Sequence, residues 1–216
     1  MGLKSILARY YAAFMIKKRN KWVKNPGPTQ QKVLSNLIQS AAHTAFGRDH
    51  HFDRISNYDD FKQQVPIRDY EALRLYIDRM VAGESDVLWK GKPAYIAKTS
   101  GTTSGAKYIP ISRESMPEHI RSAKMALLSY IHETGKTDFV SGKMIFLQGS
   151  PVLETINGIP TGRLSGIVAH HVPKYLQNNR MPSYEVNCID DWETKLQSII
   201  DETMNEDMRL ISGIPG

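Results

Sequence analysis

The chain has 216 residues, of which 41% are hydrophobic and 23% charged, a composition that excludes a disordered, collagen-like or disulfide-stapled protein. Its formal net charge of +6 comes from 28 basic and 22 acidic residues. Residues 1–25 hold seven of the basic residues and no acidic one, so the rest of the chain carries 21 basic against 22 acidic groups. The body is therefore close to neutral, and we expect no nucleic-acid partner.

A single cysteine, Cys188, excludes an internal disulfide and a cysteine-rich zinc site, and it fits a reducing compartment. No apolar run reaches the roughly 18 residues that a membrane-spanning helix needs. In the first segment most of the charges follow the apolar part, which is the wrong order for a secretory signal. We expect a cytoplasmic protein.

The first segment with helical spacing covers residues 3–24. Its apolar side chains fall near one face, with basic side chains between them. Such a helix either packs on its own domain and leaves a basic face in solvent, or lies on an anionic membrane. We favour packing on the domain and expect no membrane partner. The apolar side chains are those of Leu3, Ile6, Leu7, Tyr10, Phe14 and Trp22.

Further helices are expected before residue 86, after a break at Asn25-Pro26-Gly27-Pro28. Each has a start or stop signal in the sequence. The expected helices are 30–46 between Thr29 and Gly47, a short one opening at 57–61, and one opening at 67–70 that runs to about Ala82 and is closed by Gly83.

Beyond residue 85 the pattern changes to strands alternating with helices, which indicates an α/β fold. Asn157-Gly158 is the strongest hairpin signal in the chain. We expect N-terminal helices over residues 1–85, followed over 86–216 by a mixed β-sheet flanked by helices. The expected strands are 86–89, 94–97, 108–111, 143–148, 152–156, 159–163 and 209–211, and the expected helices are 114–133 with Ser112 as cap, 166–178 ended or interrupted near Pro173, and one from Asp190 or Asp191 to about 205.

The densest chemical signal is the stretch from Thr99 to Lys107, which lies between two expected strands and holds five hydroxyl groups, two glycines and a lysine. Glycines let successive backbone N–H groups turn toward one anion, hydroxyls add donors, and lysine adds a compact charge. A polyphosphate is the expected ligand. The stretch is not a Walker A loop, which needs Gly-Lys-Ser/Thr before a helix. A flexible hairpin without a ligand is the alternative.

Few other residues carry a chemical signal. Arg121 and Lys124 lie on the helix that follows the loop, where they either meet a substrate carboxylate or face solvent. His170 and His171 lack a third ligand at metal spacing, and Cys188 shows no sign of activation. The sequence therefore predicts no metal site and names no catalytic residue.

The stretch Thr99-Ser100-Gly101-Thr102-Thr103 resembles the phosphate-loop signature of the adenylate-forming superfamily. Where most of that superfamily continues Gly-x-Pro-Lys, this chain has Ser104-Gly105-Ala106-Lys107, which keeps the lysine spacing and moves the glycine. Flanking motifs narrow the resemblance to the auxin-responsive acyl-acid amido synthetase family, closely over residues 40–112 and more loosely elsewhere. The flanking motifs are Phe46-Gly47-Arg48-Asp49-His50, Tyr58-Asp59-Asp60-Phe61, Val65-Pro66-Ile67-Arg68-Asp69-Tyr70-Glu71, Ile77-Asp78-Arg79-Met80, Val87-Leu88-Trp89 and Lys107-Tyr108-Ile109-Pro110.

The resemblance implies part of the large N-terminal domain of an adenylate-forming ligase. In such an enzyme ATP and a carboxylic acid give an acyl-adenylate and pyrophosphate, and the amine of an amino acid then attacks the acyl carbon. The implied cofactors are ATP and Mg²⁺, the implied partners are a small carboxylic acid and an amino acid, and residues 86–216 would form part of a nucleotide- and acyl-binding domain. The residues that would hold the ATP phosphates are Thr99, Ser100, Gly101, Thr102, Thr103, Ser104, Gly105 and Lys107.

Members of that family are much longer than this chain. Their adenine-, ribose- and metal-binding residues would lie beyond Gly216, so we expect an N-terminal portion that has no ligase activity alone. The alternative is a non-catalytic module that binds a nucleotide or another anion, or that associates with a membrane surface.

Overall fold

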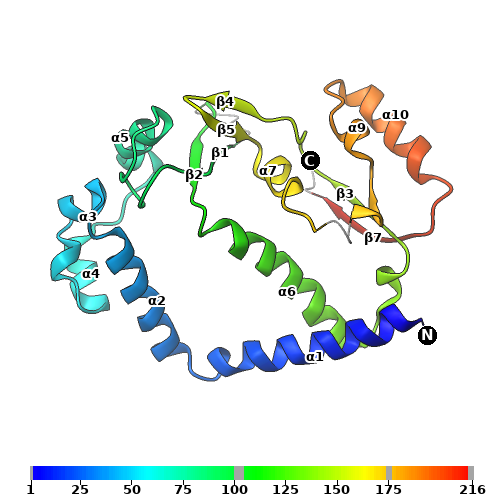
Figure 1. Cartoon of the computed structure of the whole chain (residues 1–216), viewed down its shortest axis with the longest axis horizontal. Coiled ribbons are helices and arrows are strands. Elements are labelled where there is room, and N and C mark those ends of the chain that lie inside the picture. The colour runs from blue at the N-terminus through cyan, green and yellow to red at the C-terminus, as the bar shows by residue number, and fades with distance from the viewer. Residues whose placement is uncertain (1, 100–104, 174–176, 214–216) are drawn as a thin grey trace. The chain divides into compact units, whose positions relative to one another are not determined.

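The computed structural model describes residues 2–99, 105–173 and 177–213. The chain groups into two compact units, each built of helices and strands (Figure 1). The expected α/β class is confirmed, with the described strands forming two sheets. The expected boundary at residue 85 stays a prediction. Unit 1 consists of Met1–Arg19, Pro117–Leu153 and Gly162–Gly216, and unit 2 of Asn20–Met116 and Glu154–Thr161.

Three helices of unit 2 begin at a side-chain cap. Side-chain oxygens of Thr44, Asn57 and Asp69 accept backbone N–H groups at the starts of three helices. Apolar side chains between the helices, such as Ile38 and Phe52, are buried and form the core. The helices are α2 (Pro26–Ala41), α3 (Ala45–Asp49), the 3₁₀ turn η1 (Phe52–Arg54), α4 (Tyr58–Gln64) and α5 (Tyr70–Val81).

A four-stranded sheet accompanies these helices, in the order β2-β1-β5-β4. Its hairpin turn at Asn157 and Gly158 has φ angles of 49° and 79°, as the sequence predicts for an Asn-Gly turn. The Asn157 side chain also donates a hydrogen bond of 2.8 Å to the carbonyl of Val81 at the end of α5. The strands are β1 (Tyr95–Lys98), β2 (Tyr108–Ile111), β4 (Glu154–Ile156) and β5 (Ile159–Gly162).

Unit 1 is built around a parallel three-stranded sheet in the order β6-β3-β7. The long helix α6 contributes Leu128 and Ile131 to its core, together with Met144 of β3. The elements are α1 (Leu3–Val23), whose residues up to Arg19 belong to this unit, α6 (Met116–Thr134), η2 (Asp138–Val140), β3 (Lys143–Leu147), α7 (Leu164–Ala169), β6 (Arg180–Met181), α9 (Tyr184–Asn187), α10 (Trp192–Thr203) and β7 (Met208–Gly213).

The face of α1 that packs on unit 1 differs from the predicted one. Ala12 and Ile16 are buried against the α6 core, and Arg9 and Arg19 donate hydrogen bonds to Gly135 and Ser129 near and on α6. Small side chains allow this close approach, whereas the larger apolar groups point away from it. The predicted core side chains are exposed, as shown by Leu3, Ile6, Leu7, Tyr10, Phe14 and Trp22.

The predicted helix over 30–46 is wrong in its limits. Helix α2 begins at Pro26, because a proline in the first turn loses no helical hydrogen bond, and it ends at Ala41. Gly47 does not stop a helix but lies within α3, where a Cβ atom would come 2.1 Å from the Ala41 carbonyl oxygen. Its role is close packing.

The predicted strand over 86–89 does not form. Asp86 has a left-handed φ of 58°, and the carbonyls of Asp86 and Val87 accept the N–H groups of Ala45 and Phe46 at the start of α3. The segment therefore pairs with a helix start, and its Val87 side chain is buried in the helical core.

Most other expected elements form with shifted ends. The helix expected over 166–178, ended or interrupted near Pro173, corresponds to α7 over Leu164–Ala169, and residues 174–176 lie outside the described part of the chain. The short β6 and α9 were not expected from the sequence. Across the described residues, no helix is both long and apolar enough to cross a membrane.

Candidate functional site

The base of the glycine-rich loop is closed by two strands and a pair of hydrogen bonds. Strands β1 and β2 are antiparallel, with Lys98 opposite Tyr108. One step further, the Thr99 N–H donates to the Lys107 carbonyl at 3.0 Å, and the Lys107 N–H donates to the Thr99 hydroxyl oxygen at 3.2 Å. The ends of the loop are thus fixed side by side on a rigid sheet.

Three of the predicted phosphate-binding residues lie in the described part of the loop. Thr99 and Lys107 form its base, and Gly105 has a φ of 82°, a conformation that favours glycine. Gly105 is also exposed, with open space where a Cβ atom would be. The other predicted residues, Ser100, Gly101, Thr102, Thr103 and Ser104, lie outside the described residues.

The end of the loop rests on Tyr70, the first residue of α5. The backbone N–H of Tyr108 donates to the Tyr70 hydroxyl at 2.9 Å, and the Lys107 ammonium lies 5.1 Å from the centre of the Tyr70 ring. This is the distance of a cation–π contact. Among the described residues, no carboxylate lies within salt-bridge distance of Lys107, so its charge is available to a ligand.

The start of α5 is in turn held by contacts within unit 2. The Asp69 carboxylate caps α5 by accepting the Ala72 N–H at 2.9 Å. Beside it, Arg68 donates to Nε2 of the buried His50 at 3.0 Å, and His50 Nδ1 donates to the Phe46 carbonyl at 2.8 Å. The motif residues of two separate segments thus meet and support the residue beneath the loop.

A second lysine beside the loop already has a partner. Lys98, at the end of β1, forms a 2.5 Å salt bridge with Glu154 of β4, and its side chain is 27% exposed. The pair ties β4 to the strand that enters the loop. Of the two lysines nearest the loop base, Lys98 is therefore paired with a carboxylate and Lys107, within the described residues, is not.

The predicted acyl-substrate residues on α6 lie in unit 1 and make other contacts. Arg121 forms a 2.9 Å salt bridge with Glu118 on the same helix, with both side chains more than half exposed. The Lys124 ammonium lies 4.7 Å from the ring centre of Tyr11 on α1. Their role toward a substrate stays a prediction.

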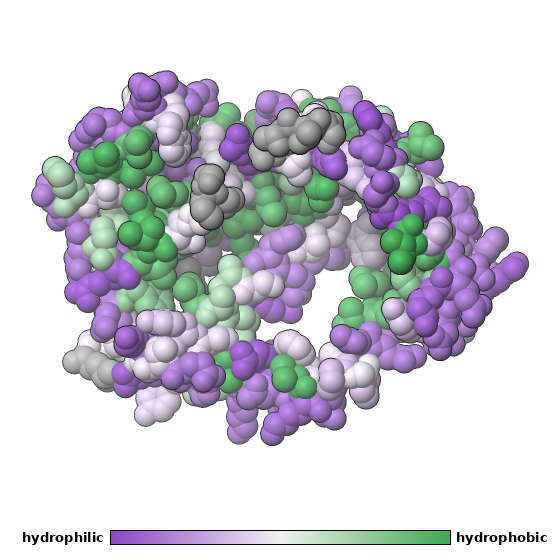
Figure 2. Space-filling model, turned by 180° about the vertical axis from the view of Figure 1, so that it is seen from behind, coloured by the Kyte–Doolittle hydropathy of each residue, from purple (hydrophilic) through white to green (hydrophobic). Residues whose placement is uncertain are grey.

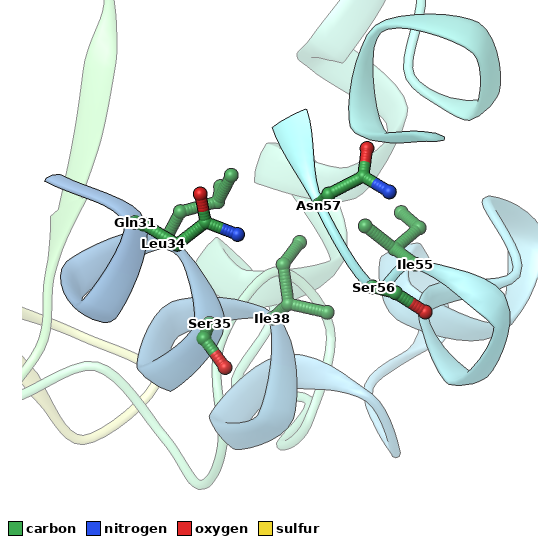
Figure 3. A pocket seen from close by; sticks show the side chains of 7 residues that line it. All are labelled: Gln31, Leu34, Ser35, Ile38, Ile55, Ser56 and Asn57. Atoms are coloured by element: carbon green, nitrogen blue, oxygen red, sulfur yellow. The ribbon is translucent and has the colours of Figure 1, made fainter. Parts of the chain in front are cut away.

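The described residues offer neither a metal site nor a substrate-sized cavity. They contain no group of three or more histidine, cysteine, aspartate or glutamate side chains placed to hold a metal ion. A hollow between α2 and the segment before α4 has a volume of about 10 Å³, room for one water molecule (Figure 3). It is too small for a substrate. Its lining residues are Gln31, Leu34, Ser35, Ile38, Ile55, Ser56 and Asn57.

The family model described as "GH3 family N-terminal domain" matches residues 15–200. The chain therefore belongs to the GH3 family.

Two curated relatives are similar over more than half of the chain. Indole-3-acetic acid-amido synthetase GH3.15 of Arabidopsis thaliana is 32% identical over 133 residues, which cover 60% of this chain and 22% of that protein. Jasmonoyl–L-amino acid synthetase JAR6 of Nicotiana attenuata is 26% identical over 142 residues, covering 64% of this chain and 24% of that protein. The chain thus matches about a quarter of the length of these relatives.

Solved structures show the same fold. The structure of GH3.15 acyl acid amido synthetase superposes with a TM-score of 0.65 at 22% identity, covering 80% of this chain and 30% of that one. A structure of AtGH3.15 in complex with 2,4-DB gives a TM-score of 0.62 at 23% identity, covering 74% of this chain and 28% of that one. The resemblance to the amido synthetase family is confirmed.

Sequence reasoning missed the support beneath the loop. Tyr70 lies far from Lys107 in the sequence, and nothing in its local spacing indicates that its hydroxyl meets the Tyr108 N–H. The signal that was present is the motif order, because Tyr70 belongs to one of the stretches that resemble the family. The stretch that contains Tyr70 has no chemical role of its own in the sequence, which is consistent with a supporting role beneath the loop.

Proposed function

We propose that this chain is the phosphate-binding portion of an ATP-dependent ligase that joins a carboxylic acid to an amino acid through an acyl-adenylate. The observation that carries the proposal is the loop base, where Thr99 and Lys107 close a glycine-containing turn and Lys107 is free of a carboxylate partner among the described residues. The GH3 family match and the two amido synthetase relatives support the reaction class.

The proposed reaction has two steps. A carboxylate oxygen of the acid attacks the α-phosphorus of ATP, and the bond from that phosphorus to the bridging oxygen breaks to release pyrophosphate. The amine of the amino acid then attacks the acyl carbon, AMP leaves, and a proton is lost from the nitrogen. Both partners in the first step are anionic, so the site must offset their repulsion with donors and cations.

The described loop residues fit a polyphosphate. Gly105, with its positive φ and no side chain, leaves backbone groups open to an anion, and Lys107 supplies a point charge. We assign the phosphates to residues 99–105 and Lys107. Mg²⁺, which would neutralise phosphate charge, is part of the proposal as an ion that enters with ATP.

We propose that the chain alone has no ligase activity, because it spans less than a third of the relatives it matches. We also propose that the substrates are a small carboxylic acid and an amino acid, and that the protein is cytoplasmic. Arg121 and Lys124 remain the candidate contacts to the acid. If AMP formed from ATP in an amino-acid-dependent way with this chain alone, the proposal of an inactive portion would fail.

The binding role is tested by isothermal titration with ATP, AMP and inorganic pyrophosphate. We expect ATP and pyrophosphate to bind, AMP to bind much more weakly, and Lys107→Ala to reduce the affinity for pyrophosphate by about tenfold, the loss of one hydrogen bond to a charged group. Lys62→Ala is the matched control, since Lys62 is an exposed lysine of unit 2 whose salt bridge with Asp59 lies on α4. If Lys107→Ala and Lys62→Ala lowered the pyrophosphate affinity equally, the loop would not be the phosphate-binding site.

A further inference from the structure

Helix α1 has two apolar faces, and within the described residues only one of them is packed. The inner face carries the small or buried residues Ala12 and Ile16, which lie against Leu128 and Ile131 of α6. Side chains at spacings of three and four residues form a separate stripe on the opposite side of the helix. One helix thus presents a packed face and a free face.

The outer face is apolar over the first three turns. Tyr10 is 75% exposed, Leu3 is 73% exposed and Phe14 is 63% exposed, although such side chains are usually buried. Ile6 and Leu7 lie on the same stripe and are also exposed. Along α1 in the space-filling view, hydrophobic and hydrophilic side chains alternate at the lower edge (Figure 2). Several large apolar side chains exposed along one helix face are typical of an interaction surface.

The same stripe becomes cationic toward the end of the helix. Lys17 and Lys21 follow Phe14 at helical spacing and are exposed, with Lys4 and Lys18 at the borders of the stripe. Residues 1–25 contain no acidic residue. Within the described residues, none of these four lysines has a carboxylate at salt-bridge distance. The surface therefore combines exposed apolar groups with uncompensated positive charge.

The positive charge and the exposed apolar groups distinguish between two possible partners of this face, a second copy of the chain and a lipid surface. A second copy would bring another segment with seven basic residues and no acidic one, so the two helices would repel each other. The GH3 family match covers residues 15–200, which include Lys17 and Lys21. An anionic lipid surface offers both an apolar phase and negative charge.

We propose that the outer face of α1 binds reversibly to an anionic lipid surface, with Leu3, Leu7, Tyr10 and Phe14 entering the headgroup boundary and Lys17 and Lys21 meeting the lipid phosphates and carboxylates. The inner face stays packed on α6, so binding needs no unfolding. The cytoplasmic leaflet carries anionic lipids, and such a surface agrees with the proposed cytoplasmic location.

Helix α10 provides a matched control within the chain. It also carries an exposed apolar stripe, which includes Leu196 and Ile200, but the charged residues beside that stripe are the acidic Glu193 and Asp201. If exposed apolar area alone caused membrane binding, α10 would bind as well as α1. If the combination with positive charge is needed, only α1 binds.

The experiment is sedimentation of the full chain with vesicles of phosphatidylcholine, with and without phosphatidylserine. We expect binding to the phosphatidylserine vesicles, weakened by added salt. Leu7→Ser/Phe14→Ser should lower the partition coefficient by at least about tenfold, and Lys17→Gln/Lys21→Gln by about as much. Leu196→Ser/Ile200→Ser should leave it unchanged. Circular dichroism is the check that each variant is folded.

Three results would overturn the proposal. The first is no sedimentation with phosphatidylserine vesicles at low salt. The second is equal loss of binding in the α1 and α10 variants, or equal binding to neutral vesicles. The third is a concentration-dependent dimer in light scattering that Leu7→Ser/Phe14→Ser abolishes, which would assign the face to a second copy.

Discussion

At the scale of single residues, Tyr70 is where the helical part of unit 2 meets the candidate site. Its hydroxyl accepts the Tyr108 N–H and its ring lies beneath the Lys107 ammonium. These two contacts act on neighbouring residues, so a change at Tyr70 alters both the position of the strand that leaves the loop and the environment of the lysine. Tyr70 thus links the start of α5 to the lysine that is proposed to bind phosphate.

Tyr70→Phe tests the hydroxyl separately from the ring. The variant leaves a partly buried backbone N–H without its acceptor, so we expect the free energy of unfolding to fall by about 1 kcal/mol in urea titrations. Tyr70→Leu also removes the ring, and we expect this variant to bind pyrophosphate more weakly than Tyr70→Phe does. Tyr58→Phe, which removes an exposed hydroxyl, is the control. A Tyr70→Phe protein as stable as the parent would mean that water replaces the lost contact at no cost.

At the scale of elements, local signals predicted the hairpin and some of the helix starts, whereas tertiary contacts decided the rest. Asn157-Gly158 and the caps at Asp69 and Asp191 act through neighbouring backbone groups, so the sequence alone indicates them. The segment 86–89 has the composition of a strand, but its carbonyls pair with the start of α3. The two-residue β6 exists because β3 offers it an edge. Contacts of that kind leave no periodic signal.

The cap of α10 is expected to make the stability of the protein depend on pH. Hydrogen bonds from the Thr194 hydroxyl and then from its backbone N–H lower the pKa of Asp191. A lowered pKa contributes stability that is present above the unfolded value of about 3.9 and is lost as the pH falls through the folded value. Asp191→Ala should therefore lower the Tm at neutral pH and flatten its fall below about pH 4.

Thermal unfolding followed by circular dichroism over a series of pH values measures this effect. Glu193→Ala is the control, since Glu193 lies exposed in the first turn of the same helix and does not act as its cap. A parallel fall of Tm with pH in the parent and in Asp191→Ala would show that the cap does not contribute.

The candidate site also has a part that local sequence signals predict and a part that only tertiary contacts bring together. The loop from Thr99 to Lys107 was recognisable because its residue types are concentrated in one short stretch. The supports of the loop, Tyr70 and the Lys98–Glu154 pair, come from segments distant in sequence, and only the fold brings them together. Periodicity also failed on α1, because a helix with apolar groups on two sides does not reveal which side is buried.

At the scale of the whole molecule, unit 1 joins segments from the beginning, middle and end of the sequence. Ala12 is fully buried against Leu128 and Ile131, so the first helix completes a core that later segments form. The size of that side chain limits how closely α1 and α6 approach.

Ala12→Leu tests this contact. The added side chain has no room in the packed core, so we expect a loss of about 1–3 kcal/mol in the free energy of unfolding. Hydrogen exchange should become faster at the amides of α6. Ala13→Leu makes the same change at an exposed position of the same helix and should leave both measurements unchanged. Similar losses in the two variants would show that the interface is not tightly packed.

The parallel pairing of β3 with β7 has a consequence for synthesis on the ribosome. The last segment of unit 2 ends at Thr161, whereas β7 of unit 1 runs to Gly213. Unit 2 can therefore finish folding before either partner strand of β3, β6 or β7, has been made, and during that interval both edges of β3 stay unpaired. The nascent chain is most vulnerable to misassembly in this window, and a pause in translation after residue 161 would lengthen it.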